Sequence, residues 1–470
     1  MTERLLLASC TVIDTRDGAL TPDTDILVQD GRIIDVRPGI ESDADRIDAS
    51  GTYVVPGYND MHAHPLNLAD PTATLELMLI HGITGYRQMS GSSKLLNQRS
   101  AGKLAFPAAS PALLATPGTI LTPANASTSD SAIATVREQH AAGADFIKAG
   151  VVGREVFFDA QAEALRLGLP IVGHLPAGID VEHASRVGMK SIEHLGPGVD
   201  LFACCSADHH SIRETAAAGA PALKAPPVKL PFLDKIMERV LAKVVLNPIN
   251  RSTPADHTNL ARAIGTFDRE RAHALAERFV ADGTWQAPTL IRIKTQELCN
   301  SPAFADDPDL AYMSPATRKK WRAAAAKFGA FPPGVRATFS EAYERQLELT
   351  KLFDDDGVKL LAGTDSSGAA WVVPGAALHR EFEEFARAGL APLRILQTAT
   401  LFAAEFLDAT DTMGTIEPGK NADLVLLADN PLTDAAHLSH ISAVVRAGRY
   451  FSGTELANRK QKLAEAHVVC

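Results

Sequence analysis

The sequence lacks an excess of basic residues and lacks long apolar runs. Its 470 residues include 46 Lys and Arg against 56 Asp and Glu, which gives a formal net charge of −10 at pH 7. Because nucleic acids are bound by basic surfaces, we expect no nucleic-acid partner. No apolar run is long enough to span a membrane, and no cleavage site follows the apolar patch at residues 5–8. We therefore expect a cytoplasmic protein with no membrane partner.

Cysteine is scarce, and two glycine-rich motifs are missing. The five Cys are odd in number and show no regular spacing, which argues against a disulfide framework and agrees with a reducing compartment. The sequence contains neither G-x-G-x-x-G nor G-x-x-x-x-G-K-[ST]. Doubly wound α/β sheets usually bind phosphates through such loops. The missing motifs therefore argue against a nucleotide-binding sheet.

Both ends of the chain contain short segments of alternating apolar and polar residues. Residues 4–55 show this pattern between turn signals such as Asp30-Gly31, and Asp423–Leu427 and Ile441–Arg446 repeat it near the other end. Neither group has enough strands to bury a face alone. We therefore expect residues 1–55 and 410–455 to form one small β-sandwich domain.

The middle of the chain, residues 56–409, alternates short β-like runs with stretches of helical periodicity. The eight β-like runs are Tyr53–Val55, Ile83–Met89, Ala112–Ala115, Asp145–Lys148, Pro170–His174, Ser191–His194, Ala287–Ile291 and Val358–Gly363. The helical stretches are Ala132–Ala142, Ala160–Leu167, Asn259–Ala281, Ser340–Phe353 and Ala376–Ala388. Eight such units predict an α/β fold, a (β/α)8 TIM barrel with insertions near residues 195–285 and 300–335.

Six titratable residues stand at the ends of five of these runs. They are His62, His64, Lys148, His174, His194 and Asp365. In a barrel, the carboxyl ends of the strands meet at one face, where active sites lie. Histidine and carboxylate ligands suit divalent zinc, cobalt, manganese or iron. The set therefore predicts a metal centre.

A lysine in this set calls for a separate explanation, because a protonated amine repels metal ions. Desolvation lowers the pKa of a buried lysine, and the free amine of Lys148 can then take up carbon dioxide to form a carbamate. We expect this carbamate to bridge two ions. One ion would bind His62, His64 and Asp365, and the other would bind His174 and His194.

This arrangement resembles the amidohydrolase superfamily. The six positions match it in order, together with Val54-Val-Pro-Gly57 before the His pair and the stretch Gly414–Val425 after the barrel. A lysine on the fourth strand and the stretch Leu378–Thr400 resemble the prolidase-like branch with a binuclear centre. That branch includes dipeptidases, ochratoxin-type amide hydrolases, and phenylurea and thiocarbamate hydrolases. The resemblance also implies a homo-oligomer.

The predicted ligands suggest a mechanism. Two metals lower the pKa of a bridging water, so that a metal-bridging hydroxide exists near neutral pH. This hydroxide attacks the substrate carbonyl, and Asp365 takes up a proton and passes it to the leaving nitrogen. We therefore expect a hydrolase that cleaves an amide, urea or carbamate C–N bond of a small molecule.

Three alternatives remain open at this point. The first is a dipeptidase of the same branch. The second is a mononuclear deaminase or chlorohydrolase, although those enzymes usually carry H-x-x-E where this sequence has His174-Leu-Pro-Ala177. The third is a non-catalytic scaffold, which would typically lose its metal ligands.

Several further residues carry weaker expectations. Aromatic residues in the insertions suggest an apolar lid and a hydrophobic substrate: Phe202, Phe232, Trp285, Trp321, Phe328 and Phe331. Arg87 is a candidate for a substrate-carboxylate clamp or a brace of the barrel. Glu193 is expected on the side of its strand opposite His194, in a structural salt bridge. Trp371 and Ser366 could line the pocket or pack in a loop, and His379 is expected to pack.

Overall fold

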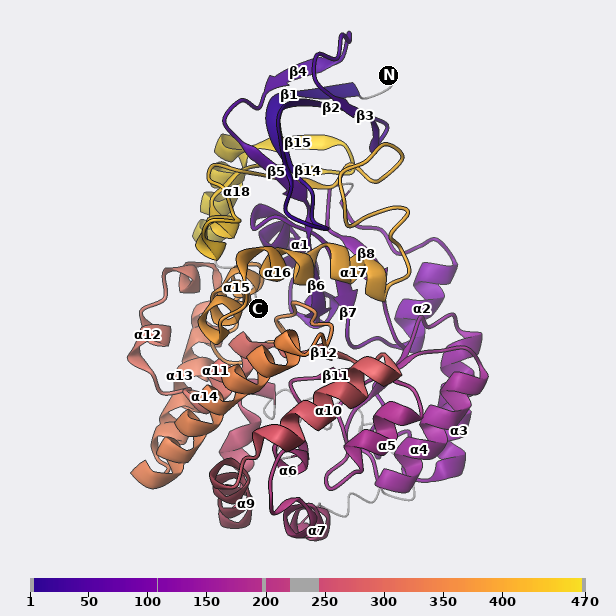
Figure 1. The fold of residues 1–470 in the computed structure, drawn as a ribbon, viewed down its shortest axis with the longest axis vertical. Helices are drawn as coiled ribbons and strands as arrows, with labels where there is room; N and C mark the ends of the chain where they lie inside the picture. Colours follow the sequence, from indigo (N-terminus) through magenta and orange to yellow (C-terminus); the bar gives the residue numbers. More distant parts are fainter. Residues whose placement is uncertain (1–3, 108, 197–199, 220–244, 467–470) are drawn as a thin grey trace.

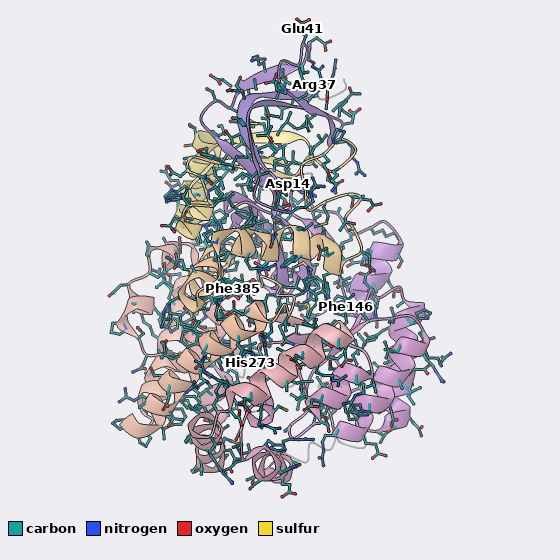
Figure 2. All side chains as sticks on the ribbon, viewed as in Figure 1. Asp14, Arg37, Glu41, Phe146, His273 and Phe385 are labelled. Atoms are coloured by element: carbon teal, nitrogen blue, oxygen red, sulfur yellow. The ribbon has the colours of Figure 1, made fainter. Side chains whose placement is uncertain are left out.

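The computed structural model describes residues 4–107, 109–196, 200–219 and 245–466. Figure 1 shows a small strand domain at one end of the molecule and a larger barrel with its helices below it. Arg37 and Glu41 mark the outer end of the strand domain in Figure 2, whereas Phe146 and Phe385 lie in the barrel part. None of the helices in the described ranges is long and apolar enough to cross a membrane.

Strands from both ends of the chain build the small domain. They are β1 (Arg4–Ile13), β2 (Leu20–Gln29), β3 (Arg32–Arg37), β4 (Asp45–Asp48), β5 (Tyr53–Pro56), β13 (Leu424–Leu427), β14 (Ile441–Arg446) and β15 (Arg449–Ser452). They form one sheet in the order β15-β14-β13-β5-β1-β2-β3, with β4 also paired to β1. Apolar side chains from both halves of this sheet, such as Val28 and Leu426, share one core. Strands from both chain ends thus share one sheet rather than the two sheets of a sandwich, while the separate domain of residues 1–55 and 410–455 stays a prediction.

The prediction that Tyr53–Val55 is the first barrel strand is wrong. This segment belongs to β5, which pairs with β1 and β13 of the small sheet. Val54 packs into the small-domain core and Val55 into the barrel core. A strand buried on both faces shows a continuous apolar run, like a barrel strand, and this explains the misassignment. The barrel begins instead with β6 (Tyr58–Ala63).

The barrel strands form two parallel sheets. The first contains β6, β7 (Ile83–Gln88) and β8 (Ala112–Ala115), and the second contains β9 (Ile147–Ala149), β10 (Ile171–Gly173), β11 (Met189–Glu193) and β12 (Trp285–Ala287). Backbone contacts join them on both sides. Asp145 donates to the Thr116 carbonyl at 3.0 Å, Leu361 to Gln286 at 2.9 Å and Met61 to Ala362 at 2.8 Å. The eighth predicted run, Val358–Gly363, therefore lies between β12 and β6.

Helices surround the barrel, and most of the predicted helical stretches fall within them. The early ones are α1 (Pro71–Ile80), α2 (Ser93–Ser100), α3 (Ser129–Ala141), α4 (Arg154–Arg166) and α5 (Val181–Arg186). The later ones are α14 (Pro333–Asp355), α15 (Ala376–Ala388), α16 (Pro392–Ala399), α17 (Leu401–Phe406) and α18 (Gly453–Ala466). Phe402 and Phe406 of α17 pack against the interior residues Met61 and Trp285 of the strands.

The two expected insertions contain further helices. The first holds α6 (Asp200–Cys204), α7 (His209–Gly219), α9 (Pro254–Gly265) and α10 (Arg269–Asp282), and α11 (Leu290–Glu297) follows β12. The second holds α12 (Pro302–Ala305) and α13 (Pro315–Gly329). The predicted single helix Asn259–Ala281 is two helices, because the Asp268 side chain accepts from the backbone N–H groups of Glu270 and Arg271 and starts α10.

Candidate metal centre

All six predicted site residues lie at the same end of the barrel strands. His62 and Lys148 lie on β6 and β9, whereas His64, His174, His194 and Asp365 follow β6, β10, β11 and the eighth run. His62, His194 and Asp365 place possible ligand atoms within 4.8 Å of one another. Parallel strands that end at one face thus bring together residues spread over some 300 positions of the sequence.

The distances among the six residues confirm that they form one cluster. Oδ1 of Asp365 lies 3.0 Å from Nε2 of His64 and 3.5 Å from Nε2 of His62. The Lys148 amine lies 3.5 Å from the same His62 nitrogen. The ring of His194 is centred 4.6 Å from that of His62 and 5.1 Å from that of His174.

A second layer of side chains fixes three of the imidazoles through Nδ1. His62 Nδ1 donates to Oε2 of Glu193 at 2.6 Å. His64 Nδ1 lies 2.7 Å from Ser90 Oγ, whose own proton goes to Asn67, so this histidine is the donor as well. His194 Nδ1 lies 2.6 Å from Thr289 Oγ1. A proton on Nδ1 leaves the lone pair on Nε2, the tautomer that binds metal.

The backbone at the cluster adopts unusual conformations. His194, Thr289 and Asp365 have φ values of 58°, 49° and 50°, in the left-handed region that non-glycine residues rarely adopt. Such conformations persist where the surrounding structure enforces them, often at functional sites. The absence of a side chain at Gly363 allows His62 to lie close to it, because a Cβ at position 363 would lie 2.6 Å from Cβ of His62. The Gly363-Thr-Asp365 turn can therefore place its carboxylate beside the His pair.

Asp60 holds this turn against β6. Its Oδ1 accepts from the backbone N–H groups of His62 and Thr364, both at 3.1 Å, and its Oδ2 accepts from the Thr364 hydroxyl at 2.7 Å. Burial raises the pKa of Asp60 to about 6, and these hydrogen bonds oppose that rise. The residue ties the strand of His62 to the segment of Asp365.

Burial lowers the pKa of four of the six residues. It lowers the pKa of Lys148 to about 8 and that of His174 to about 3, and it lowers the pKa of His64 and His194 as well. For Asp365, burial acts to raise the pKa, but the contacts with His62 and His64 hold it well below its ordinary value. His64, His174 and His194 are thus biased toward the neutral imidazole, Asp365 toward the carboxylate and Lys148 toward partial deprotonation.

Glu193 and Arg87 form a buried ion pair beneath the cluster. Arg87 donates to Oε1 of Glu193 at 2.9 Å and to the Met61 carbonyl at 2.6 Å. The salt bridge expected for Glu193 is present, and Arg87 braces the barrel interior rather than forming a substrate clamp. The expectation that Glu193 points away from the site is wrong. The left-handed backbone of His194 breaks the strand alternation, so both residues reach His62.

Helix α11 contributes two residues that the sequence did not indicate. Thr289 precedes the helix and contacts His194, and Arg292 donates from Nε to Oδ2 of Asp365 at 3.2 Å. The buried Glu381 of α15 accepts from the backbone N–H groups of Leu290 and Ile291 at 2.9 and 2.7 Å and so anchors the start of α11. No sequence motif marks Thr289 or Arg292 of this segment as site residues, so the sequence could not assign these roles.

The expected apolar lid is not supported. Phe202, Trp321 and Phe328 are buried in the main core, with Phe331 packed against it, and Trp285 lies in the barrel interior against α17. Phe232 falls outside the described residues. Trp371 packs in its loop and donates to the Cys299 carbonyl at 2.9 Å. His379 packs against Tyr58, as expected.

Comparison with known proteins agrees with this fold. The model of the amidohydrolase family matches residues 338–451, and no curated protein matches the sequence. With the fold, this match confirms the predicted resemblance to the amidohydrolase superfamily.

Solved structures of similar fold carry related names. A bottromycin amidohydrolase is 24% identical, with a TM-score of 0.72 over 99% of this chain and 91% of its own. A Xaa-Pro dipeptidase with bound methionine is 19% identical, with a TM-score of 0.61 over 96% of this chain and all of its own. A phenylurea hydrolase B is 15% identical, with a TM-score of 0.59 over 97% of this chain and 98% of its own. At these identities the likeness is one of fold.

Proposed function

We propose that this protein is a binuclear metal-dependent hydrolase that cleaves an amide-like C–N bond of a small molecule. The observation that carries the proposal is the convergence of four histidines, Lys148 and Asp365 at one end of the barrel strands. Three of the histidines already have Nδ1 engaged by Glu193, Ser90 and Thr289. This donor set fits divalent zinc, cobalt, manganese or iron.

The residues divide into two ligand groups. We assign His62, His64 and Asp365 to one ion, and His174 and His194 to the other. Lys148 would join them as a carbamate: its free amine forms a bond to the carbon of carbon dioxide and loses one proton, which leaves an anion with two oxygens. The lowered pKa of Lys148, about 8 because of burial, makes the free amine available near neutral pH.

Metal ions bound here would supply Lewis-acid chemistry, activating water and polarising the scissile carbonyl. Asp365 is the group of this chain that moves the proton. Its ionised carboxylate takes a proton from the attacking water and delivers it to the leaving nitrogen, which is general acid–base catalysis. Its lowered pKa keeps the carboxylate ionised near neutral pH, the form that can accept a proton.

The substrate belongs to the amides, ureas or carbamates, with a dipeptide as the second candidate. The aromatic residues of the insertions do not support a substrate preference for hydrophobic compounds. Those within the described ranges pack in the core or at its edge.

Metal analysis and a hydrolysis panel on one purified sample test the proposal. The panel contains N-acyl amino acids, dipeptides, anilides and phenylureas. We expect about two transition-metal ions per chain and cleavage of one class. One ion with release of ammonia or chloride would indicate the mononuclear deaminase or chlorohydrolase instead. No metal and no turnover would indicate a scaffold.

A further inference from the structure

Two arginines lie at the candidate metal centre, and they differ in how their donors are used. Arg87 is fully buried and has a carboxylate partner of its own, Glu193, in addition to the Met61 carbonyl. Arg292 is 3% exposed and donates from Nε to Asp365 and from one terminal nitrogen to the Val245 carbonyl at 2.6 Å. Among the described residues, its other terminal nitrogen is buried without a hydrogen-bond partner.

An unused donor on a buried guanidinium is costly. An arginine carries five N–H donors in a fixed planar fork, and a buried donor without an acceptor loses its hydration without replacement. Arg292 also lacks a carboxylate of its own within the described residues, because Asp365 is shared with His62 and His64. The guanidinium beside the cluster therefore retains capacity for a further anionic partner.

The position of Arg292 is rigidly set. Glu381 holds the first backbone N–H groups of α11, and Lys294 of the same helix donates to Glu384 of α15 at 2.5 Å. A guanidinium group held in place by a helix binds a planar carboxylate with defined geometry. Its contact with Asp365, the proposed proton carrier, places Arg292 beside the candidate metal centre.

We propose that Arg292 binds a carboxylate of the substrate, so that the substrate class is an N-acyl amino acid or a peptide with a free carboxylate near the scissile amide. This inference rests on the proposed hydrolase function and narrows it. Arg292 then sets substrate specificity, while Arg87 braces the barrel. A neutral phenylurea or anilide would leave the guanidinium without its partner and should be a poor substrate.

The test uses matched compounds that differ in one group. N-acetylphenylalanine and alanylphenylalanine are each compared with their C-terminal primary amides on the metal-loaded wild type, Arg292→Met, Arg292→Lys and the control Lys319→Met, which removes an exposed cation of α13. We expect wild type to prefer the free carboxylates. Arg292→Met should reduce kcat/KM for the carboxylates by about 10- to 100-fold, as for loss of a hydrogen bond to a charged group, and change that for the amides much less. Arg292→Lys should retain part of the preference.

Calorimetric binding of N-acetylphenylalanine to the same proteins gives a readout that does not need turnover. It should weaken in Arg292→Met and stay unchanged in Lys319→Met. An equal loss on carboxylates and amides, with unchanged binding, would overturn the proposal and leave Arg292 as a positioning residue for Asp365. If wild type binds two metals and hydrolyses no compound of any panel, the proposed function fails, and the binding comparison still decides on Arg292.

Discussion

The candidate metal centre has two sides that are built differently. One side is carried by barrel strands: His62, Lys148 and Glu193 are almost completely buried, and Glu193 is matched by Arg87. The other side is carried by loops and α11: Asp365 is partly exposed, and Arg292 keeps an unused buried donor. We infer from this difference that the strand side holds metal and that the helix side, which also carries the proposed ligand Asp365, meets the substrate.

The largest expected effect comes from the strand side, at Lys148. Lys148→Ala removes the group proposed to bridge the two ions, so metal content and activity should fall together. We expect a loss in kcat of about 10³-fold or more, because Lewis-acid stabilisation amounts to several kcal/mol. Elemental analysis and the hydrolysis assay measure both. Short carboxylic acids with added metal should restore part of the rate, whereas the exposed Lys94→Ala should be unchanged. Full activity in Lys148→Ala would contradict the proposal that the strand side holds the metal ions through Lys148.

The next effect is expected at Glu193, beneath the same side. The carboxamide in Glu193→Gln cannot accept from both His62 and Arg87, and it leaves the Arg87 charge buried without a counter-charge. Metal affinity should fall by about 10- to 100-fold, as for other partners of metal-binding histidines. The free energy of unfolding should fall by about 3–5 kcal/mol, as for a broken buried ion pair. Metal titration and urea unfolding test both, with the exposed Glu182→Gln as control. Unchanged affinity would make Glu193 a purely structural residue.

The sequence predicted which six residues meet at one end of the barrel, whereas their binding of metal stays a prediction. His62, His64, Lys148, His174, His194 and Asp365 could be found because each stands at the end of an apolar run, and parallel strands in a barrel end at one face. The convergence then follows from the fold, without knowledge of side-chain conformations.

The residues that the sequence missed depend on local geometry. The inward direction of Glu193 follows from the left-handed backbone of His194, which strand alternation does not predict. Arg292 and Thr289 depend on how α11 is anchored by Glu381, about 90 positions later in the chain. Tyr53–Val55 was misassigned because a strand shared between two cores has the same apolar pattern as a barrel strand.

A smaller effect is expected where the helix side supports a metal ligand. Thr289→Val keeps the side-chain volume but removes the hydroxyl next to Nδ1 of His194. We expect metal affinity to fall by about tenfold, at the low end for partners of metal-binding histidines. Thr289→Ser keeps the hydroxyl and should bind metal as wild type does. A competition titration with a coloured chelator measures the difference. An effect as large as that of Glu193→Gln would mean that both sides hold the metal equally.

The smallest effect is a pH dependence that separates Lys148 from the rest of the cluster. Burial lowers its pKa to about 8 in the metal-free protein, so the ammonium form dominates below this value and cannot add carbon dioxide. The free-amine fraction rises from about 10% at pH 7 to about 50% at pH 8. At a constant concentration of dissolved carbon dioxide, the initial rate at which carbon dioxide and zinc activate the metal-free protein should therefore rise about fivefold over this interval and level off above pH 9. Lys148→Ala should show no activation that depends on carbon dioxide at any pH. A flat profile in the wild type would contradict the carbamate, because the free amine of Lys148 is the form that adds carbon dioxide.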